Sequence, residues 1–320
     1  KELLGKANVK IDDDLPEIDY KNEVIGELTI QLNTLGKGGN SNAKSGPKGG
    51  CFNCGGPHWA KDCPLPPKGG GGKGGGKFNS KKKGINHAIS LFNCGANLID
   101  IGGESTRPGS KVIRENLEWQ RIEKILKSLI KKKIPISLDT RKSRIMSKGI
   151  NLGVKLINDV SGLNFDKNSI KILKKYNIPF VLQHSLGNPD VMQKNPKYKN
   201  VLLDIYDFFE EKLNNLRQNG IYHNNIILDP GIGFGKNLKH NMTIIKNISI
   251  YHSLGLPILL GISRKRFIKD LSGNNDSSLR IGGTISSSIF AMLQGVQMLR
   301  VHDVNEVNQA IKVFKALINK

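Results

Sequence analysis

The strongest constraint on the fold is a rhythm that begins near residue 84, where short apolar runs alternate with amphipathic stretches. Short buried strands that alternate with amphipathic helices predict a parallel sheet, because each parallel connection needs a crossover helix. The expected strands are 97–102, 135–139, 154–158, 179–184, 225–229, 256–262 and 297–302. The expected helices are 84–95, 116–131, 142–151, 167–176, 201–219, 239–250, 279–294 and 304–318.

Seven strands with eight helices predict an α/β fold, a (β/α)8 TIM barrel that lacks its usual first strand. A doubly wound open sheet is the alternative. No Gly-x-Gly-x-x-Gly motif follows the first expected strand, which disfavours a dinucleotide-binding sheet. No apolar run reaches the roughly 18 residues that a membrane helix needs, and no secretory signal is visible, so we expect a cytoplasmic protein.

The part before the barrel divides by composition. Residues 1–35 form an acidic segment of uncertain structure, with an alternating run at 24–32 that fits one short strand. Residues 36–76 contain 15 glycines and read as flexible linker. The expected domains are therefore 1–35, a Gly/Lys-rich segment at 36–83, and a barrel at 84–320.

Inside the Gly/Lys-rich segment lies a cluster of metal-ligand residue types. Cys51, Cys54, His58 and Cys63 follow the spacing Cys-x2-Cys-x3-His-x4-Cys, which fits tetrahedral Zn2+. The motif resembles the CCHC zinc knuckle of Gag-type proteins. The resemblance implies binding of single-stranded nucleic acid through residues 36–83, with stacking on Phe52 and Trp59. A purely structural zinc site is the alternative.

The net charge of +22 permits phosphate-bearing partners, although lysines solvated on the surface would give the same value.

Polar side chains gather where the expected strands end. Because barrel enzymes build their active sites at the carboxyl ends of the strands, these residues are candidates for one site. They supply carboxylates and an amide for a polar heterocycle and cations for an anion. The relevant strand ends carry Asp139, Asn158, His184, Asp229, Lys265, Arg300 and His302.

Five segments at or near these strand ends resemble the signatures of dihydropteroate synthases. They stand in that family's order and spacing, and they favour the synthases over the methyltransferases that share the pterin-binding barrel. The segments are 99–109 (IDIGGESTRPG), 157–161 (INDVS), 228–236 (LDPGIGFGK), 263–265 (SRK) and 300–304 (RVHDV).

The resemblance implies a transferase that joins 6-hydroxymethyl-7,8-dihydropterin diphosphate to 4-aminobenzoate and releases diphosphate, a step of folate biosynthesis. It implies that Mg2+ screens the diphosphate. The implied pterin-binding residues are Asp139, Asn158, Asp229 and Lys265. The implied diphosphate-binding residues are Arg300, His302 and Thr106. The implied aminobenzoate-binding residues are Phe234, Lys265, Ser105, Thr106, Arg107 and Pro108.

One departure from the family concerns the first strand of its barrel. The family's first strand ends in Asn-Val-Thr-Pro-Asp-Ser-Phe, which helps to place the magnesium, and that motif is missing here. We expect either that the barrel lacks this strand or that the run 28–33, with its Asn33 ending, takes its place. An open barrel would expose two sheet edges.

Three interpretations therefore stay open. The first is an active synthase with an added zinc knuckle. The second is a nucleic-acid-binding protein that carries an inactive barrel remnant, and the third is a chimeric gene. A homodimer is compatible with each of them.

Overall fold

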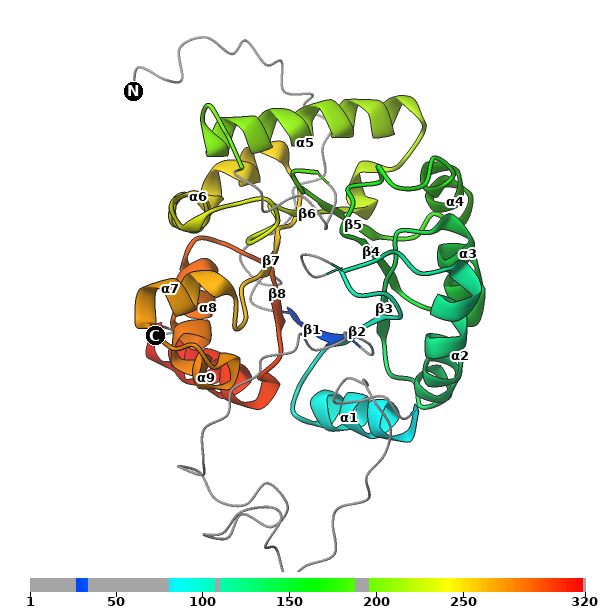
Figure 1. Cartoon of the computed structure of the whole chain (residues 1–320), viewed down its shortest axis with the longest axis horizontal. Helices are drawn as coiled ribbons and strands as arrows, with labels where there is room; N and C mark the ends of the chain where they lie inside the picture. The colour runs from blue at the N-terminus through cyan, green and yellow to red at the C-terminus, as the bar shows by residue number, and fades with distance from the viewer. Residues whose placement is uncertain (1–26, 34–80, 107–109, 188–195, 319–320) are drawn as a thin grey trace, which may run out of the picture.

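Each apolar run in the repeating part forms a strand that pairs in parallel with its neighbour. The computed structural model describes residues 27–33, 81–106, 110–187 and 196–318, and of 27–33 only the backbone. The strands run in the order β6-β5-β4-β3-β2-β1-β8-β7. A parallel bridge between Leu228 and Ile258 joins β6 to β7, with Leu228 N donating to Pro257 O at 2.9 Å. The sheet is thereby closed into a barrel ringed by helices (Figure 1).

The strands are β1 (Glu27–Asn33), β2 (Leu98–Gly102), β3 (Ile136–Asp139), β4 (Leu156–Asp159), β5 (Phe180–Gln183), β6 (Ile226–Asp229), β7 (Leu259–Gly261) and β8 (Met298–Val301). The α-helices are α1 (Lys81–Asn93), α2 (Glu115–Lys131), α3 (Ser143–Leu152), α4 (Ser169–Tyr176), α5 (Val201–Gln218), α6 (Leu238–Lys246), α7 (Arg266–Ser272), α8 (Ile281–Leu293) and α9 (Val304–Ile318). The described residues also form the short 3-10 helices η3 (His223–Asn225), η4 (Ile248–Leu254) and η5 (Ser277–Leu279).

The first strand of the barrel is present, so the expectation that it is missing was wrong. Strand β1 lies between β8 and β2, with Glu27 opposite Met298 and Asn33 opposite Gly102. The alternative, that the run 28–33 takes this place, is what the structure has. The physical reason is that a barrel of seven strands leaves two rows of unpaired backbone groups, which this strand pairs. Residues 27–33, which are part of the segment 1–35, therefore belong to the barrel.

Alternation of side chains along the strands divides the core into two parts. One set packs inside the barrel as a small apolar cluster near the amino ends of the strands, consisting of Leu98, Leu156, Val181, Ile227, Leu259 and Met298. The intervening residues, such as Ile99, Ile157 and Leu228, belong to the larger cluster that contains the buried helix residues. Because side chains alternate, the residue two positions after each of these inward residues also points into the barrel. These second inward positions lie at the carboxyl ends of the strands and form the site described below.

Helix α5 illustrates how local sequence places the outer layer. Asn200 caps it, because its side-chain oxygen accepts from Leu202 N and Leu203 N. Its buried residues recur every three or four positions, as Ile205, Phe209 and Leu213 do, so one face of the helix covers the sheet.

Most predicted boundaries lie within three residues of those in the structure, and two elements differ more. The expected helix 239–250 ends at Lys246 and continues as the 3-10 helix η4, and the short helix α7 was not predicted. Helix α7 has seven residues, too few for a clear helical period. No helix in the described ranges is long and apolar enough to cross a membrane.

Candidate active site

A ring of buried polar side chains lines the inside of the barrel at the carboxyl ends of the strands. Each lies two residues after an inward position at the level of the apolar cluster, and none is more than 5% exposed. A polar layer directly above an apolar layer is the arrangement of a barrel active site. The ring consists of Asp100, Asp139, Asn158, Gln183, Asp229 and Arg300.

The structure thus brings together four of the predicted site residues and adds two. Asp139, Asn158, Asp229 and Arg300 were predicted, whereas Asp100 and Gln183 were not. The missed signal was the two-residue period, since Asp100 follows Leu98 and Gln183 follows Val181 at the same spacing.

On one side of the ring, the carboxylate of Asp100 contacts both an amide and a guanidinium. Its Oδ2 accepts from Asn158 Nδ2 at 3.0 Å and lies 3.6 Å from Arg300 Nη1. Burial raises the pKa of Asp100, and the Arg300 charge opposes that rise. The carboxylate therefore orients the amide of Asn158 and the guanidinium of Arg300 toward fixed positions.

Asp229 is held by the loop that follows it. Its Oδ1 accepts from the backbone N of Gly231 at 2.8 Å. Gly231 has φ +68°, and a Cβ at this residue would lie 2.0 Å from the carbonyl oxygen of His184. A glycine is therefore required both by the backbone conformation and by the close approach of the β5 end.

We expect Gly231→Ala to destabilise the protein by about 3 kcal/mol, through left-handed strain and displacement of the β5 end. The matched control is Gly273→Ala, because Gly273 has φ +74° and nothing within 4 Å of the added Cβ. Gly273→Ala should lower the free energy of unfolding by about 1 kcal/mol, because only the left-handed backbone strain is added. Chemical denaturation measures both, and equal losses would contradict a role for the His184 contact.

Lys265 follows β7 and enters the same mouth. Its Nζ donates to the carbonyl oxygen of Ile232 and lies 4.9 Å from the centre of the Phe234 ring. Burial, followed by the positive charge of Arg300, lowers the pKa of Lys265 to about 7, although Asp229 opposes the shift. The amine is thus poised to change its charge near neutral pH.

His302 and Ser263 form the outer edge of the cationic side. The exposed imidazole has its Nδ1 2.9 Å from Ser263 Oγ, and the backbone N of His302 donates to the same hydroxyl at 3.1 Å. Next to them, Arg264 binds Asp303 through both sides of its guanidinium. The residues after β7 and β8 are therefore tied together, which holds His302 beside Arg300.

A buried ion-pair network anchors the loop after β2. Glu104 Oε2 binds Arg141 Nη2 at 2.7 Å, and Glu104 Oε1 binds Lys142 Nζ at 3.1 Å and accepts from Ile113 N at 2.8 Å. Burial by itself would raise the pKa of Glu104. The hydrogen bonds from Arg141 and Ile113 and the positive charges of Arg141 and Lys142 outweigh burial and hold this pKa below its ordinary value. Both ends of the segment 104–113 are thereby fixed.

This segment carries the predicted loop residues. Thr106 is buried and Ser105 is half-buried. Arg107 and Pro108 lie outside the described residues, so their predicted roles stay predictions.

The β6–α6 loop contains a buried lysine that the sequence did not single out. Lys236 Nζ lies 2.9 Å from His184 Nδ1 and donates to the carbonyl oxygen of Phe234 at 3.0 Å. Burial lowers the pKa of Lys236, and burial with the Lys236 charge lowers the pKa of His184. These contacts fix the backbone that presents Phe234.

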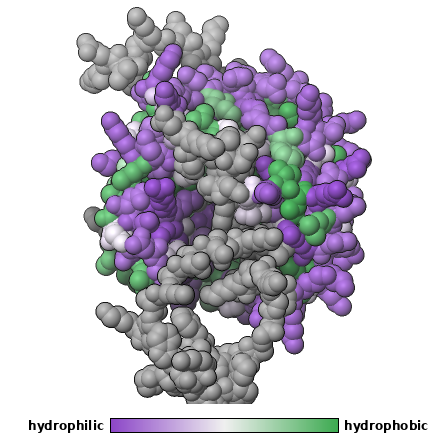
Figure 2. All heavy atoms as spheres, in the orientation of Figure 1, coloured by the Kyte–Doolittle hydropathy of each residue, from purple (hydrophilic) through white to green (hydrophobic). Residues whose placement is uncertain are grey.

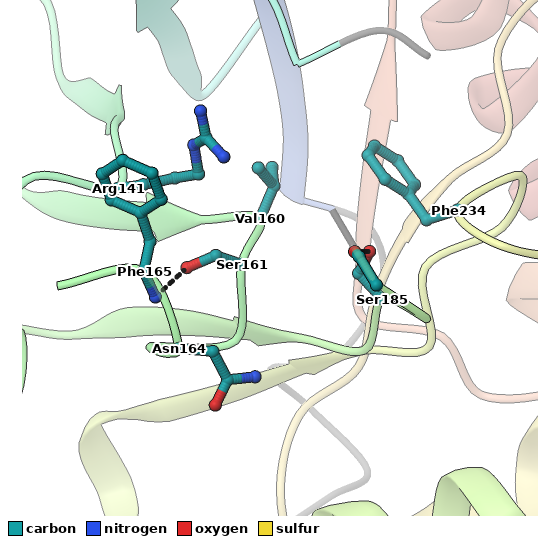
Figure 3. A pocket seen from close by; sticks show the side chains of 8 residues that line it. Arg141, Val160, Ser161, Asn164, Phe165, Ser185 and Phe234 are labelled. Atoms are coloured by element: carbon teal, nitrogen blue, oxygen red, sulfur yellow. Dashed lines mark hydrogen bonds between the residues drawn. The ribbon is translucent and has the colours of Figure 1, made fainter. Parts of the chain in front are cut away.

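An open pocket with about 120 Å³ of free space adjoins this ring, beside the ends of β4, β5 and β6 (Figure 3). Phe234 and Ser185 lie on one side of it, and Arg141, Val160 and Phe165 lie on the other. The guanidinium of Arg141 is 4.3 Å from the Phe165 ring centre. Figure 2 shows that the described residues around the barrel are largely hydrophilic, with scattered apolar patches between them.

The predicted zinc ligands Cys51, Cys54, His58 and Cys63 lie outside the described residues, and the zinc site stays a prediction. Within the described ranges, no group of three or more His, Cys, Asp or Glu side chains is arranged to hold a metal ion.

Comparisons with known proteins agree with this geometry. Residues 73–302 match the family model described as pterin binding enzyme. The dihydropteroate synthase of Escherichia coli K12 is 35% identical over 246 residues, which cover 77% of this chain and 86% of that protein.

Two solved structures have a similar fold. A Clostridium difficile dihydropteroate synthase, crystallised in the presence of pteroic acid, aligns with a TM-score of 0.71 at 35% identity and covers 78% of this chain and 92% of its own. A Xanthomonas albilineans dihydropteroate synthase with 4-aminobenzoic acid aligns with a TM-score of 0.71 at 31% identity, covering 76% and 86%. The chain belongs to the pterin binding enzyme family and, within it, to the dihydropteroate synthases, which are transferases.

Proposed function

We propose that this protein condenses 6-hydroxymethyl-7,8-dihydropterin diphosphate with 4-aminobenzoate to give dihydropteroate and diphosphate. The observation that carries the proposal is the polar ring, in which three carboxylates, two amides and a cation converge beside Lys265. The relatives that are named dihydropteroate synthases, one crystallised with pteroic acid and one with 4-aminobenzoic acid, support the same substrates. The reaction breaks the bond between the pterin methylene carbon and a diphosphate oxygen, forms a bond from that carbon to the amine nitrogen of 4-aminobenzoate, and releases one proton from that nitrogen.

The pterin would be held by Asp139, Asn158 and Asp229, with Lys265 beside the ring. An aminopyrimidinone presents two adjacent N–H donors, and a carboxylate such as that of Asp229 can accept both. The Gly231 hydrogen bond keeps this carboxylate oriented before the substrate arrives. Because these side chains are buried, a bound pterin would be shielded from water, which strengthens each polar contact with it.

The diphosphate would be bound by Arg300 and His302, with Thr106 contributing a hydroxyl. As the carbon–oxygen bond breaks, negative charge develops on the departing oxygen, and preorganised cations stabilise that charge. Arg300 is fixed by Asp100 and His302 by Ser263, so neither needs to reorganise during the reaction. No covalent nucleophile from the protein is needed.

The aminobenzoate would lie between Phe234, Lys265 and the segment 105–108. The contact of Lys265 with the Phe234 ring shows that an aromatic surface and a cation lie together at the mouth. Such a pair suits an aromatic carboxylate, whose ring can pack on Phe234 while its charge stays near a cation.

Mg2+ belongs to the proposal as a screen for the diphosphate oxygens. The residues present fit this role, because Mg2+ needs only one or two protein oxygens when phosphates supply the others. Strand β1 ends at Asn33, opposite Gly102, so its backbone reaches the carboxyl end of the barrel, where the diphosphate would lie.

The test is turnover of the full chain with both substrates and Mg2+, with dihydropteroate detected chromatographically. Product formation that depends on both substrates is expected. Absence of product at saturating concentrations, from protein that is folded by circular dichroism, would refute the proposed activity.

The charge of Lys265 should give the reaction a pH dependence. With its pKa near 7, the amine carries its positive charge below that pH and loses it above. We therefore expect kcat/KM for the pterin diphosphate to fall as the pH rises through about 7. Lys265→Arg, which stays charged, should abolish this inflection, whereas an unchanged profile would assign the titration to the substrate.

We also propose that residues 36–83 bind one Zn2+ through Cys51, Cys54, His58 and Cys63, on the strength of their spacing. Metal analysis of purified protein should give one zinc per chain. Cys54→Ser should lose that zinc, whereas Cys94→Ser, the control, should retain it. Equal zinc content in both variants would contradict the assignment.

A further inference from the structure

Gln183 is a buried carboxamide whose hydrogen-bonding groups have no partner. It is the last residue of β5 and is 0% exposed. Neither its Nε2 nor its Oε1 has a hydrogen-bond partner within the described part of the chain. An amide that is buried in this way destabilises a folded protein, so both atoms need an explanation.

The place of Gln183 in the barrel provides that explanation. Strand β5 lies between β4 and β6, so Gln183 is flanked by the strands that carry Asn158 and Asp229. It pairs in register with Asp229, and its Cγ lies 3.5 Å from the point where a Cβ on Gly231 would stand. The carboxamide therefore belongs to the part of the ring that surrounds the Asp229 carboxylate.

We propose that Gln183 hydrogen-bonds the pyrimidinone edge of the pterin beside Asp229 and acts as a specificity-determining residue. This inference rests on the proposed function. The pyrimidinone edge carries an acceptor, its C4 oxygen, next to the N–H donors that suit Asp229. A carboxamide has both a donor and an acceptor, so it complements this edge where an apolar side chain cannot. A site with buried polar groups of this kind rejects ligands that leave them unpaired.

The test is Gln183→Met, which keeps the side-chain volume and removes both polar groups. Affinity for 6-hydroxymethylpterin, measured by calorimetry, should fall about tenfold, the loss of one to two hydrogen bonds. KM for the pterin diphosphate should rise by a similar factor, while KM for 4-aminobenzoate should change less than about twofold. The melting temperature without ligand should stay constant or increase, because two unsatisfied buried groups are gone.

The matched control is Gln297→Met. Gln297 stands just before β8, and its Oε1 accepts from Ile258 N at 2.8 Å. Its loss should lower the melting temperature and leave pterin affinity unchanged.

Two outcomes would overturn the inference. The first is an unchanged pterin affinity in Gln183→Met. The second is a loss of affinity together with a lowered melting temperature, which would show a general structural defect. Failure of the unmodified protein to bind 6-hydroxymethylpterin would instead refute the proposed function, and the inference with it.

Discussion

Replacing Asp229 by Asn should reduce kcat/KM for the pterin diphosphate by about 10³-fold, because two charge-assisted hydrogen bonds to the ring are lost. The variant retains an oxygen that can accept from Gly231 N, so the loop after β6 should keep its position. The effect should therefore appear in catalysis and in pterin binding, with little change in the melting temperature. Steady-state kinetics with varied pterin diphosphate measure it.

The control for Asp229→Asn is Asp270→Asn on the exposed side of α7, where the carboxylate binds only Arg266 among the described residues. This variant should have unchanged kinetics. An Asp229→Asn enzyme within twofold of the unmodified one would exclude the carboxylate from pterin recognition.

The largest loss of stability is expected from breaking the ion-pair network behind the loop 104–113. Lys142 Nζ lies 2.5 Å from Glu118 Oε2, and their side chains are 5% and 0% exposed. Lys142→Met leaves the Glu118 carboxylate buried, with Thr140 Oγ1 as its remaining donor at 2.6 Å. Removing one partner of a buried pair costs about 3–5 kcal/mol, which chemical denaturation will detect.

A double-mutant cycle separates the pair from its surroundings. Glu118→Gln combined with Lys142→Met restores neutrality, so it should be clearly more stable than the sum of the single losses predicts. Glu123→Gln on the same helix is the control, because its partner Lys127 is 57% exposed and the pair should contribute nothing measurable. Additive losses in the cycle would show that the two side chains act independently.

Sequence periodicity predicted the barrel because most of its strands and helices have a local signal, whereas the short helix α7 has none. The carboxyl ends of the strands could be recognised as the site, and Asp139, Asn158, Asp229 and Arg300 were found in this way. Asp100 and Gln183 escaped because each is a single polar residue in or beside an apolar run. Their inward direction follows only when the register of all strands is known.

The first strand shows the opposite limitation. Residues 28–33 alternate as a short strand does, but they are separated from β2 by more than sixty residues of different composition. A strand gains stability only from its neighbours, so its own sequence does not tell which sheet it joins. The open edges of β2 and β8 decide that in the folded protein.

The sequence by itself therefore determined the repeating α/β architecture and the types of residue at the strand ends, because periodicity and motifs are local properties of the chain. Only the tertiary structure decided that the barrel is closed by β1 and that Asp100 orients both Asn158 and Arg300. It also decided that Gln183 is buried without a partner next to Asp229. These facts depend on closure, which brings residues distant in the sequence to one side of the sheet and removes water from around them.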